Sequence, residues 1–160
     1  MSIGSAFLGR HEIATSDEME RLGRSLGEQL QPGDLLVMTG PLGAGKTTFT
    51  RGLAEGLGVR GPVQSPTFVI ARTHPSLVGG APLVHVDAYR LGSAAELDDL
   101  DIDFVRSVVV IEWGRPMASA VADAWWDIEI ERPVGNVGDI ADDELDADAP
   151  RFVTIARVQA

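Results

Sequence analysis

The stretch from Gly40 to Thr47 constrains this chain more than any other, because it reads G-x-x-x-x-G-K-T. An apolar run at 35–39 precedes it and suits a buried strand, while apolar side chains recur every fourth residue over 49–57, as on one face of a helix. A strand, a glycine-rich loop and a helix in this order form the context that a phosphate-binding loop requires. We therefore predict that the chain binds a nucleoside triphosphate.

The chemistry of such a loop assigns roles to its residues. Its glycines allow successive backbone N–H groups to point inward, and the helix that follows presents its positive N-terminal end to the same place. We expect Lys46 to neutralise the β- and γ-phosphates and the Thr47 hydroxyl to hold Mg²⁺. The predicted nucleotide-binding set in this segment is Gly40, Pro41, Leu42, Gly43, Ala44, Gly45, Lys46, Thr47 and Thr48.

The bulk composition predicts one globular domain spanning residues 1–160. The chain has 160 residues and 44% hydrophobic residues, which is enough for a single sizeable core. Cysteine is absent, so neither a disulfide nor a thiolate metal site can form. No apolar run approaches the 18 residues of a membrane span, and the N-terminus lacks the pattern of a secretory signal. We expect a cytoplasmic protein.

The formal net charge of −11 argues against direct binding to RNA or DNA. Such binding depends on the neutralisation of phosphates by Lys and Arg, and here 13 basic residues face 24 acidic ones. If RNA is involved in the function, we expect another protein to hold it.

The rest of the chain predicts an α/β fold of the P-loop NTPase class. We expect a mostly parallel sheet with helices on both faces and an antiparallel C-terminal hairpin. The expected helices are a capped one from Thr15 to before Pro32, the loop helix to about 57, and shorter ones near 94–100 and 116–124. The expected strands are 35–39, 68–71, 83–87, 108–114, 126–131 and 152–156. The segment 135–150 has six acidic residues and no basic one, and we expect a mobile surface loop there.

Two carboxylates lie at the C-terminal ends of buried strands, Asp87 and Glu112. Ligands bind at the C-terminal ends of strands in open α/β sheets, so either carboxylate could hold Mg²⁺ or its water ligands, or orient an attacking water. The spacing leaves open which of them contacts the metal directly. It also leaves open whether Ser65 and Thr67 sense the γ-phosphate or only shape a turn. The acidic run at 98–103 is more typical of a solvated face than of a metal site.

Three classes of small P-loop protein compete. A GTPase should carry D-x-x-G after a strand and N-K-x-D for guanine, and neither occurs: Ala88 follows Asp87, and 136–139 reads N-V-G-D. A small-molecule kinase should have an arginine-rich lid, and the basic residues after the loop are scattered. An ATPase that acts on partner proteins explains the acidity, the small size and the lack of an evident acceptor site. A kinase remains the alternative, and an adaptor that binds no nucleotide is a third class.

Four motifs together resemble the TsaE (YjeE) family, the bacterial P-loop ATPases of tRNA threonylcarbamoyladenosine biosynthesis. They are 40–48 (GPLGAGKTT), 65–68 (SPTF), 85–91 (HVDAYRL) and 111–113 (IEW), within a resemblance that runs from about Thr15 to Ile130. The resemblance implies ATP as the nucleotide, Mg²⁺ as the metal, and hydrolysis that is slow in the isolated protein. It also implies work in a complex with TsaB- and TsaD-like partners, with tRNA reached only through that complex.

Mapped onto matching positions, the resemblance gives each site residue a role. It makes Lys46 the phosphate lysine, Asp87 the carboxylate needed for hydrolysis and Glu112 a metal ligand with Thr47. It makes Ser65 and Thr67 a switch-like segment, places Trp113 beside the site and brings Ser16 near the adenine. Two departures stand out: Pro41 occupies a position that is commonly acidic in the family, and it removes one backbone N–H from the loop. The acidic segment 135–150 has no counterpart that we can place.

Overall fold

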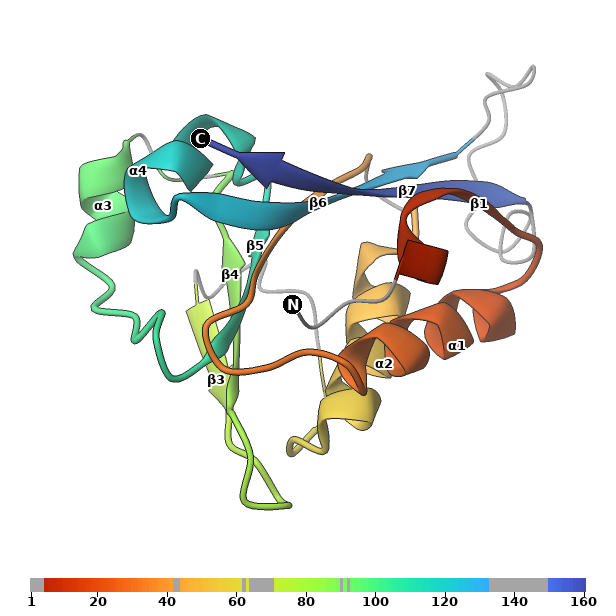
Figure 1. Cartoon of the computed structure of the whole chain (residues 1–160), viewed down its shortest axis with the longest axis horizontal. Helices are drawn as coiled ribbons and strands as arrows, with labels where there is room; N and C mark the ends of the chain where they lie inside the picture. Colours follow the sequence, from red (N-terminus) through yellow and green to blue (C-terminus); the bar gives the residue numbers. More distant parts are fainter. Residues whose placement is uncertain are drawn as a thin grey trace.

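The computed structural model describes residues 5–41, 44–61, 63, 71–89, 91, 93–132 and 150–160 (Figure 1). These residues form a seven-stranded sheet of β1 (Gly9–Ile13), β2 (Leu35–Thr39), β3 (Ala71–His74), β4 (Leu83–Asp87), β5 (Val108–Glu112), β6 (Ala124–Glu131) and β7 (Arg151–Gln159). The helices are α1 (Ser16–Gly27), α2 (Lys46–Leu57), α3 (Ala94–Asp98) and α4 (Ala118–Val121), with 3₁₀ turns η1 (Ser5–Phe7) and η2 (Arg115–Met117).

The sheet is mixed, with the strand order β1-β7-β6-β2-β5-β4-β3. Its four central strands, β6, β2, β5 and β4, run parallel to one another. At one edge β7 and β1 add antiparallel pairs, and at the other edge β3 pairs antiparallel with β4. The predicted C-terminal hairpin is confirmed, with Ile128 opposite Ile155. The expectation of a mostly parallel sheet holds only for the centre, because the edge strands β1 and β3 add antiparallel pairs that were not expected.

Both edge strands carry weak sequence signals, which explains that error. β1 reads GRHEI and β3 reads ARTH, and most of their side chains are exposed or half-buried. Edge strands often carry charged and polar residues, because these discourage pairing with other chains. The central strands are buried on both faces and therefore appear in the sequence as apolar runs, as β5 does with VVVIE.

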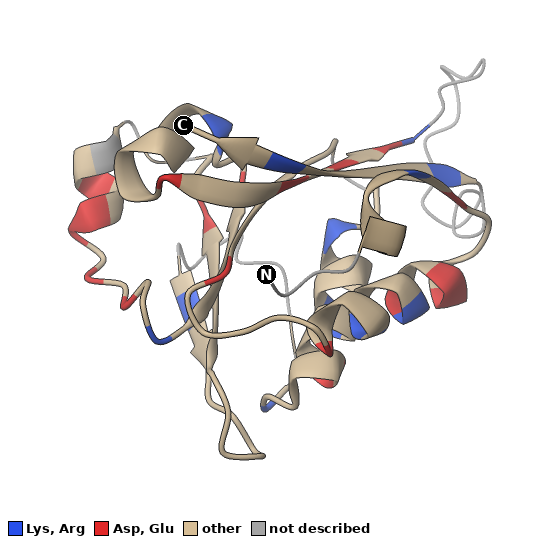
Figure 2. Cartoon of the chain, in the orientation of Figure 1, with Lys and Arg blue, Asp and Glu red and all other residues tan. Residues whose placement is uncertain are grey.

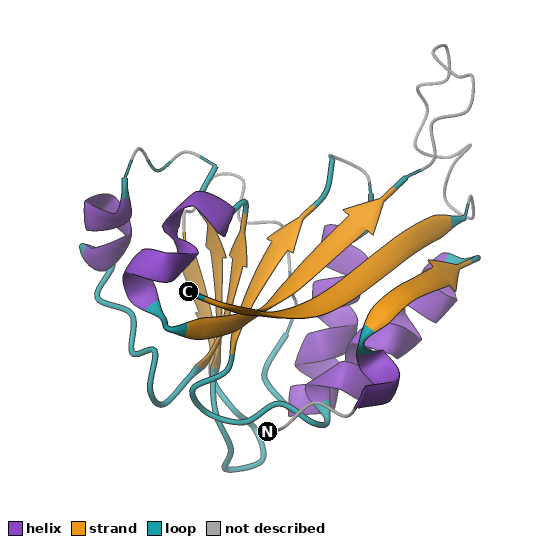
Figure 3. Cartoon of the chain, turned by 45° about the horizontal axis from the view of Figure 1, so that its top comes forward, coloured by secondary structure: helices purple, strands orange, loops and turns teal. Residues whose placement is uncertain are grey.

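Helices cover both faces of the sheet, as predicted (Figure 3). One apolar core lies under α1 and α2 and includes Leu36, Val110 and Ile128 from the sheet. The second core lies on the opposite face and includes Val37, Val109 and Leu97, the last from α3. Successive residues of β2 and β5 thus point into different cores, which fixes which strand residues can reach the start of α2.

The predicted start of α1 is confirmed. The Thr15 hydroxyl accepts a hydrogen bond from the Glu18 N–H at 3.2 Å, and the Glu18 carboxylate accepts one from the Ala14 N–H at 2.8 Å. The helix ends at Gly27, so Leu30 is buried in the turn that follows. The predicted helix at 116–124 is shorter, because η2 and α4 end at Val121 and β6 begins at Ala124.

Several predictions concern residues outside the described part of the chain. These are the roles of Leu42, Gly43, Ser65 and Thr67, most of the strand expected at 68–71, and the loop expected at 135–150. Of that strand, Ala71 is described, and it opens β3.

Charge is distributed unevenly over the described residues (Figure 2). Acidic residues of α3 and the segment after it, 98–103, are exposed, as expected for a solvated face. Along α1, the acidic residues Asp17, Glu18 and Glu20 precede the basic residues Arg21 and Arg24. Within the described ranges, every helix is too short or too polar to cross a lipid bilayer.

His74, at the end of β3, gives the fold a predicted pH dependence. Its ring is 6% exposed, and Nδ1 lies 2.9 Å from the Arg60 carbonyl oxygen. Burial lowers the pKa of His74 below its ordinary 6.5, against the effect of that hydrogen bond; His85 and Arg72 lower it further. The unfolded chain therefore takes up a proton before the folded one, so stability is lost as the pH falls below about 6.5.

Replacing His74 by Asn should remove the loss of stability at low pH while keeping a donor near the Arg60 carbonyl. Relative to the variant, the wild type should lose up to about 1.4 kcal/mol per pH unit between about 6.5 and the lower pKa of the folded state. Urea unfolding at pH 7.5, 6 and 5 measures the difference. Parallel stability curves for the two proteins would contradict it.

Candidate functional site

The glycine-rich loop lies at the C-terminal end of β2, with parallel strands on both sides of that strand. α2 begins at Lys46, and the residue before it, Gly45, has φ +112°, a conformation that favours glycine. No side chain caps this helix, and its first internal hydrogen bond runs from the Phe49 N–H to the Gly45 carbonyl. The preceding amides of α2 therefore form a positive helix end that suits an anion.

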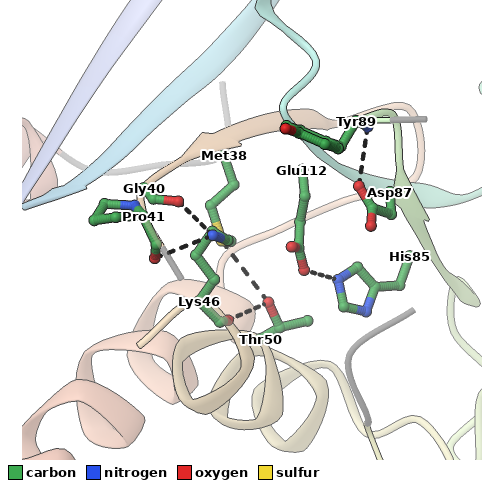
Figure 4. A network of polar contacts seen from close by, with 9 residues as sticks. All are labelled: Met38, Gly40, Pro41, Lys46, Thr50, His85, Asp87, Tyr89 and Glu112. Carbon is green, nitrogen blue, oxygen red and sulfur yellow. Dashed lines mark hydrogen bonds and ion pairs between the residues drawn. The ribbon is translucent and has the colours of Figure 1, made fainter. Parts of the chain in front are cut away.

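The Lys46 ammonium is directed back into the loop (Figure 4). It donates to the Gly40 carbonyl, and its Nζ lies 3.3 Å from the Pro41 carbonyl oxygen and 4.9 Å from the centre of the Trp113 ring. The helix behind it is fixed by Thr50, whose hydroxyl donates to the Lys46 carbonyl at 2.8 Å. Lys46 is thus held at the loop by the residues that surround it.

Burial governs the electrostatics of Lys46, which is 9% exposed. Desolvation lowers the pKa of its ammonium below the ordinary 10.5, while the negative charges of Glu112 and Asp87 act in the opposite direction. An anion bound beside Lys46 would favour its charged form further, because burial has removed much of the solvation of the ammonium by water.

Asp87 and Glu112 are opposite each other in the parallel pair β4–β5, and Glu112 is also opposite Met38 of β2. Opposite residues in a parallel pair share a face of the sheet, so both carboxylates lie on the face covered by α2. Asp87 Oδ1 accepts a hydrogen bond from the Tyr89 N–H at 3.0 Å. Glu112 is 4% exposed, and its Oε2 lies 2.6 Å from His85 Nε2.

Trp113 links the loop to these carboxylates. Its φ is +63°, an uncommon value for a bulky residue, and its N–H donates to the Met38 carbonyl at 2.8 Å. Its ring meets the exposed ring of Tyr89 edge-on, with centroids 5.8 Å apart. It also lines a cleft of about 370 Å³ beside the loop, together with residues 39–41 and 129–132.

Comparison with known proteins identifies the family. The model of the family described as "Threonylcarbamoyl adenosine biosynthesis protein TsaE" matches residues 13–136. The chain belongs to the TsaE family. The match covers every element from α1 to β6 and includes all four motifs on which the resemblance was based.

Individual TsaE proteins agree with this assignment. The chain is 56% identical over 124 residues to the tRNA threonylcarbamoyladenosine biosynthesis protein TsaE of Streptomyces coelicolor, covering 76% of this chain and 84% of the relative. It is 38% identical over 117 residues to that of Bacillus subtilis, covering 72% and 73%. The crystal structure of Bacillus subtilis YdiB superposes with a TM-score of 0.67 at 29% identity, covering 94% of this chain and 85% of YdiB.

The structure brings several of the predicted TsaE site residues together. Lys46, Asp87, Glu112 and Trp113 meet at the C-terminal ends of β2, β4 and β5. Thr47 and Thr48 are half-buried in the first turn of α2. Ser16 is exposed at the start of α1; one turn later Met19 Cε lies 3.0 Å from where a Cβ on Gly45 would be.

Sequence reasoning missed two residues that contact the predicted site. His85 lies in the motif at 85–91, where the sequence alone assigns it no role, but it precedes Asp87 by two residues and so shares its face of β4. That spacing is a signal that could have found it. Arg151, from β7, donates from Nε to the Ala44 carbonyl at 3.1 Å. No local pattern predicts this contact, because it depends on how β7 packs against the loop.

The residues present fit a Mg²⁺ ion that is held jointly by the protein and a bound phosphate better than one held by protein ligands alone. Within the described ranges, no group of three or more His, Asp or Glu residues could hold a metal ion. The available donors are the Thr47 hydroxyl and the carboxylates of Glu112 and Asp87, all oxygen ligands of the kind Mg²⁺ prefers. Mg²⁺ is typically bound by one or two carboxylates together with substrate phosphates, and this donor set matches that pattern.

Proposed function

We propose that this chain is a Mg²⁺-dependent ATPase that supports threonylcarbamoyladenosine modification of tRNA. The single observation that carries the ATPase proposal is the uncapped start of α2 at the end of a central parallel strand, with Lys46 and two strand-end carboxylates beside it. Membership of the TsaE family supports the tRNA pathway, because the relatives are named for tRNA threonylcarbamoyladenosine biosynthesis.

Each side chain has a distinct task in this proposal. The loop amides and Lys46 bind the phosphates and stabilise the negative charge that develops during phosphoryl transfer. Pro41 offers no N–H, so the donors come from the other loop residues. Thr47 and Glu112 would hold Mg²⁺, which when bound neutralises phosphate charge. Asp87 would orient the attacking water or the water ligands of the metal, with Oδ1 already fixed by the Tyr89 N–H.

The nucleotide's other contacts are proposed from the same arrangement. Ser16 would border the adenine, because the first turn of α1 packs against Gly45 through Met19. Trp113 would form one wall beside the phosphates, since its ring already contacts Lys46. Ser65 and Thr67 would act as a switch-like segment that responds to the γ-phosphate.

We propose that hydrolysis is slow in the isolated protein and resets a complex with TsaB- and TsaD-like partners. A net charge of −11 disfavours direct tRNA binding, so tRNA would be held by a partner. Pull-down from the native cytosol with and without ATP tests this assembly. Recovery of TsaB- and TsaD-like proteins that depends on ATP supports it, and their absence under both conditions contradicts it.

Replacing Asp87 by Asn should lower ATP hydrolysis by a factor of about 10² while changing ATP affinity by less than about threefold. The substitution keeps the size and hydrogen-bonding capacity of the side chain but removes its charge. Phosphate release in the reconstituted complex, together with calorimetric ATP binding, measures both effects. Asp98→Asn, an exposed acidic residue on α3, serves as the matched control.

Two outcomes would count against this assignment. Normal hydrolysis by the Asp87→Asn protein would remove Asp87 from catalysis. Transfer of the γ-phosphate from labelled ATP to a nucleoside or small alcohol, with little free phosphate, would replace the ATPase by a P-loop kinase.

A further inference from the structure

A short polar contact between β4 and β5 joins two buried side chains, His85 and Glu112. His85 Nε2 lies 2.6 Å from Glu112 Oε2, and the two side chains are 0% and 6% exposed. A buried carboxylate is costly unless hydrogen bonds compensate for its lost hydration. Glu112 therefore depends on this histidine for its place in the interior.

The strand register explains how the pair forms at the site. His85 and Asp87 are alternate residues of β4, so they share a face of the sheet. Asp87 lies opposite Glu112 at the strand ends. His85 lies opposite Val110, two residues earlier in each strand. Figure 4 shows the Glu112 carboxylate directed at the His85 ring, with Asp87 above the ring and joined to Tyr89. The histidine thus supports Glu112 from inside the sheet.

The chemistry of the pair fixes its direction. An ionised carboxylate only accepts hydrogen bonds, so His85 Nε2–H donates to Glu112 Oε2. The other ring nitrogen, Nδ1, is buried and has no hydrogen-bond partner among the described residues. One oxygen of Glu112 is therefore held by His85, and the second, Oε1, makes no hydrogen bond within the described part of the chain.

We propose that His85 is a positioning residue that fixes Oε2 of Glu112 so that Oε1 is presented to the divalent cation bound with the nucleotide. This inference rests on the proposed function of the same site. Groups that orient metal ligands through hydrogen bonds typically contribute 10- to 100-fold in metal affinity or activity. We assign His85 a contribution of this size without any contact to ATP.

A matched pair of substitutions separates positioning from packing. His85→Gln places an amide nitrogen near the position of Nε2 and keeps a donor to Glu112. His85→Asn keeps an amide only near the position of Nδ1 and cannot reach Glu112. The probe is Mn²⁺, titrated against the full chain saturated with ADP, with free Mn²⁺ followed by electron paramagnetic resonance.

The expected result is a loss of Mn²⁺ affinity of about tenfold or more for His85→Asn and of less than about threefold for His85→Gln. ADP affinity in EDTA should stay within about twofold for both variants, because His85 is expected to act on the cation through Glu112 and not on the nucleotide itself. In a Glu112→Gln background, His85→Asn should cause little further loss, since His85 acts through Glu112.

Three results would overturn the proposal: unchanged Mn²⁺ affinity in folded His85→Asn, an equal loss in both variants, or full additivity with Glu112→Gln. If His85→Asn does not fold, nitrogen NMR of the wild-type ring decides, because a proton on Nδ1 instead of Nε2 would contradict the bond to Glu112. Failure of the wild type to bind ADP with Mn²⁺ would instead refute the nucleotide site itself.

Discussion

Replacing Lys46 by Ala should reduce ATP hydrolysis by a factor of about 10²–10³, the cost typical of removing one preorganised charge contact to the transition state. Lys46 is directed into the loop by the Gly40 and Pro41 carbonyls, and no other Lys or Arg among the described residues makes these contacts. ATP affinity should also fall, because the ammonium is bound to the phosphates in the ground state as well.

The Lys46 variant should remain folded. Burying the Lys46 charge costs free energy, so its removal does not by itself destabilise the fold. The two nearby carboxylates also keep their hydrogen bonds, Glu112 to His85 and Asp87 to the Tyr89 N–H. Phosphate release and thermal unfolding should be measured together. Arg51→Ala removes an exposed charge from the same helix and should leave hydrolysis within about twofold. Unchanged hydrolysis in folded Lys46→Ala would contradict the assignment.

Replacing Gly52 by Ala should destabilise the protein by about 2–3 kcal/mol, although helix propensity alone predicts a gain of about 1 kcal/mol. The reason is the close approach of α1 and α2. A Cβ on Gly52 would lie 2.1 Å from the Glu20 carbonyl oxygen, and one on Gly23 would lie 2.2 Å from the Phe49 carbonyl oxygen. Both contacts are to backbone, which cannot rotate away, so the helices must separate.

Urea unfolding measures this effect, and Gly61→Ala provides the control. Gly61 is exposed, and the nearest atom to an added Cβ would be 3.8 Å away, so its stability should change by less than about 0.5 kcal/mol. A Gly52→Ala protein as stable as the wild type would show that α2 can shift without cost. Such a shift would also disturb the loop, because α2 begins at Lys46.

The central part of the fold could be predicted from sequence because its signals are local. The apolar runs of β2 and β5 identify buried strands, and the residues around Lys46 identify the turn between β2 and α2. The Thr15 cap and the stop at Gly58, where φ is +77°, are equally local. Each of these features is decided by residues within one turn or strand.

What sequence could not give depends on contacts between distant segments. Gly52 looks like a weak point of a helix until α1 is placed against it. β1 pairs with β7, from which it is separated by most of the sequence, and the polar residues of β1 give no sign of this partner. The pairing of His85 with Glu112 needs the register of β4 and β5, although the alternation in β4 places His85 and Asp87 on one face.

The most direct measurement is a crystal structure of the chain with Mg²⁺ and a non-hydrolysable ATP analogue. We expect the phosphates at the start of α2, in contact with Lys46 and the loop amides. We expect the metal between the phosphates and the oxygens of Thr47 and Glu112, with Asp87 nearby. An analogue bound elsewhere, or a loop that stays empty at saturating analogue and Mg²⁺, would contradict the proposed ATPase site.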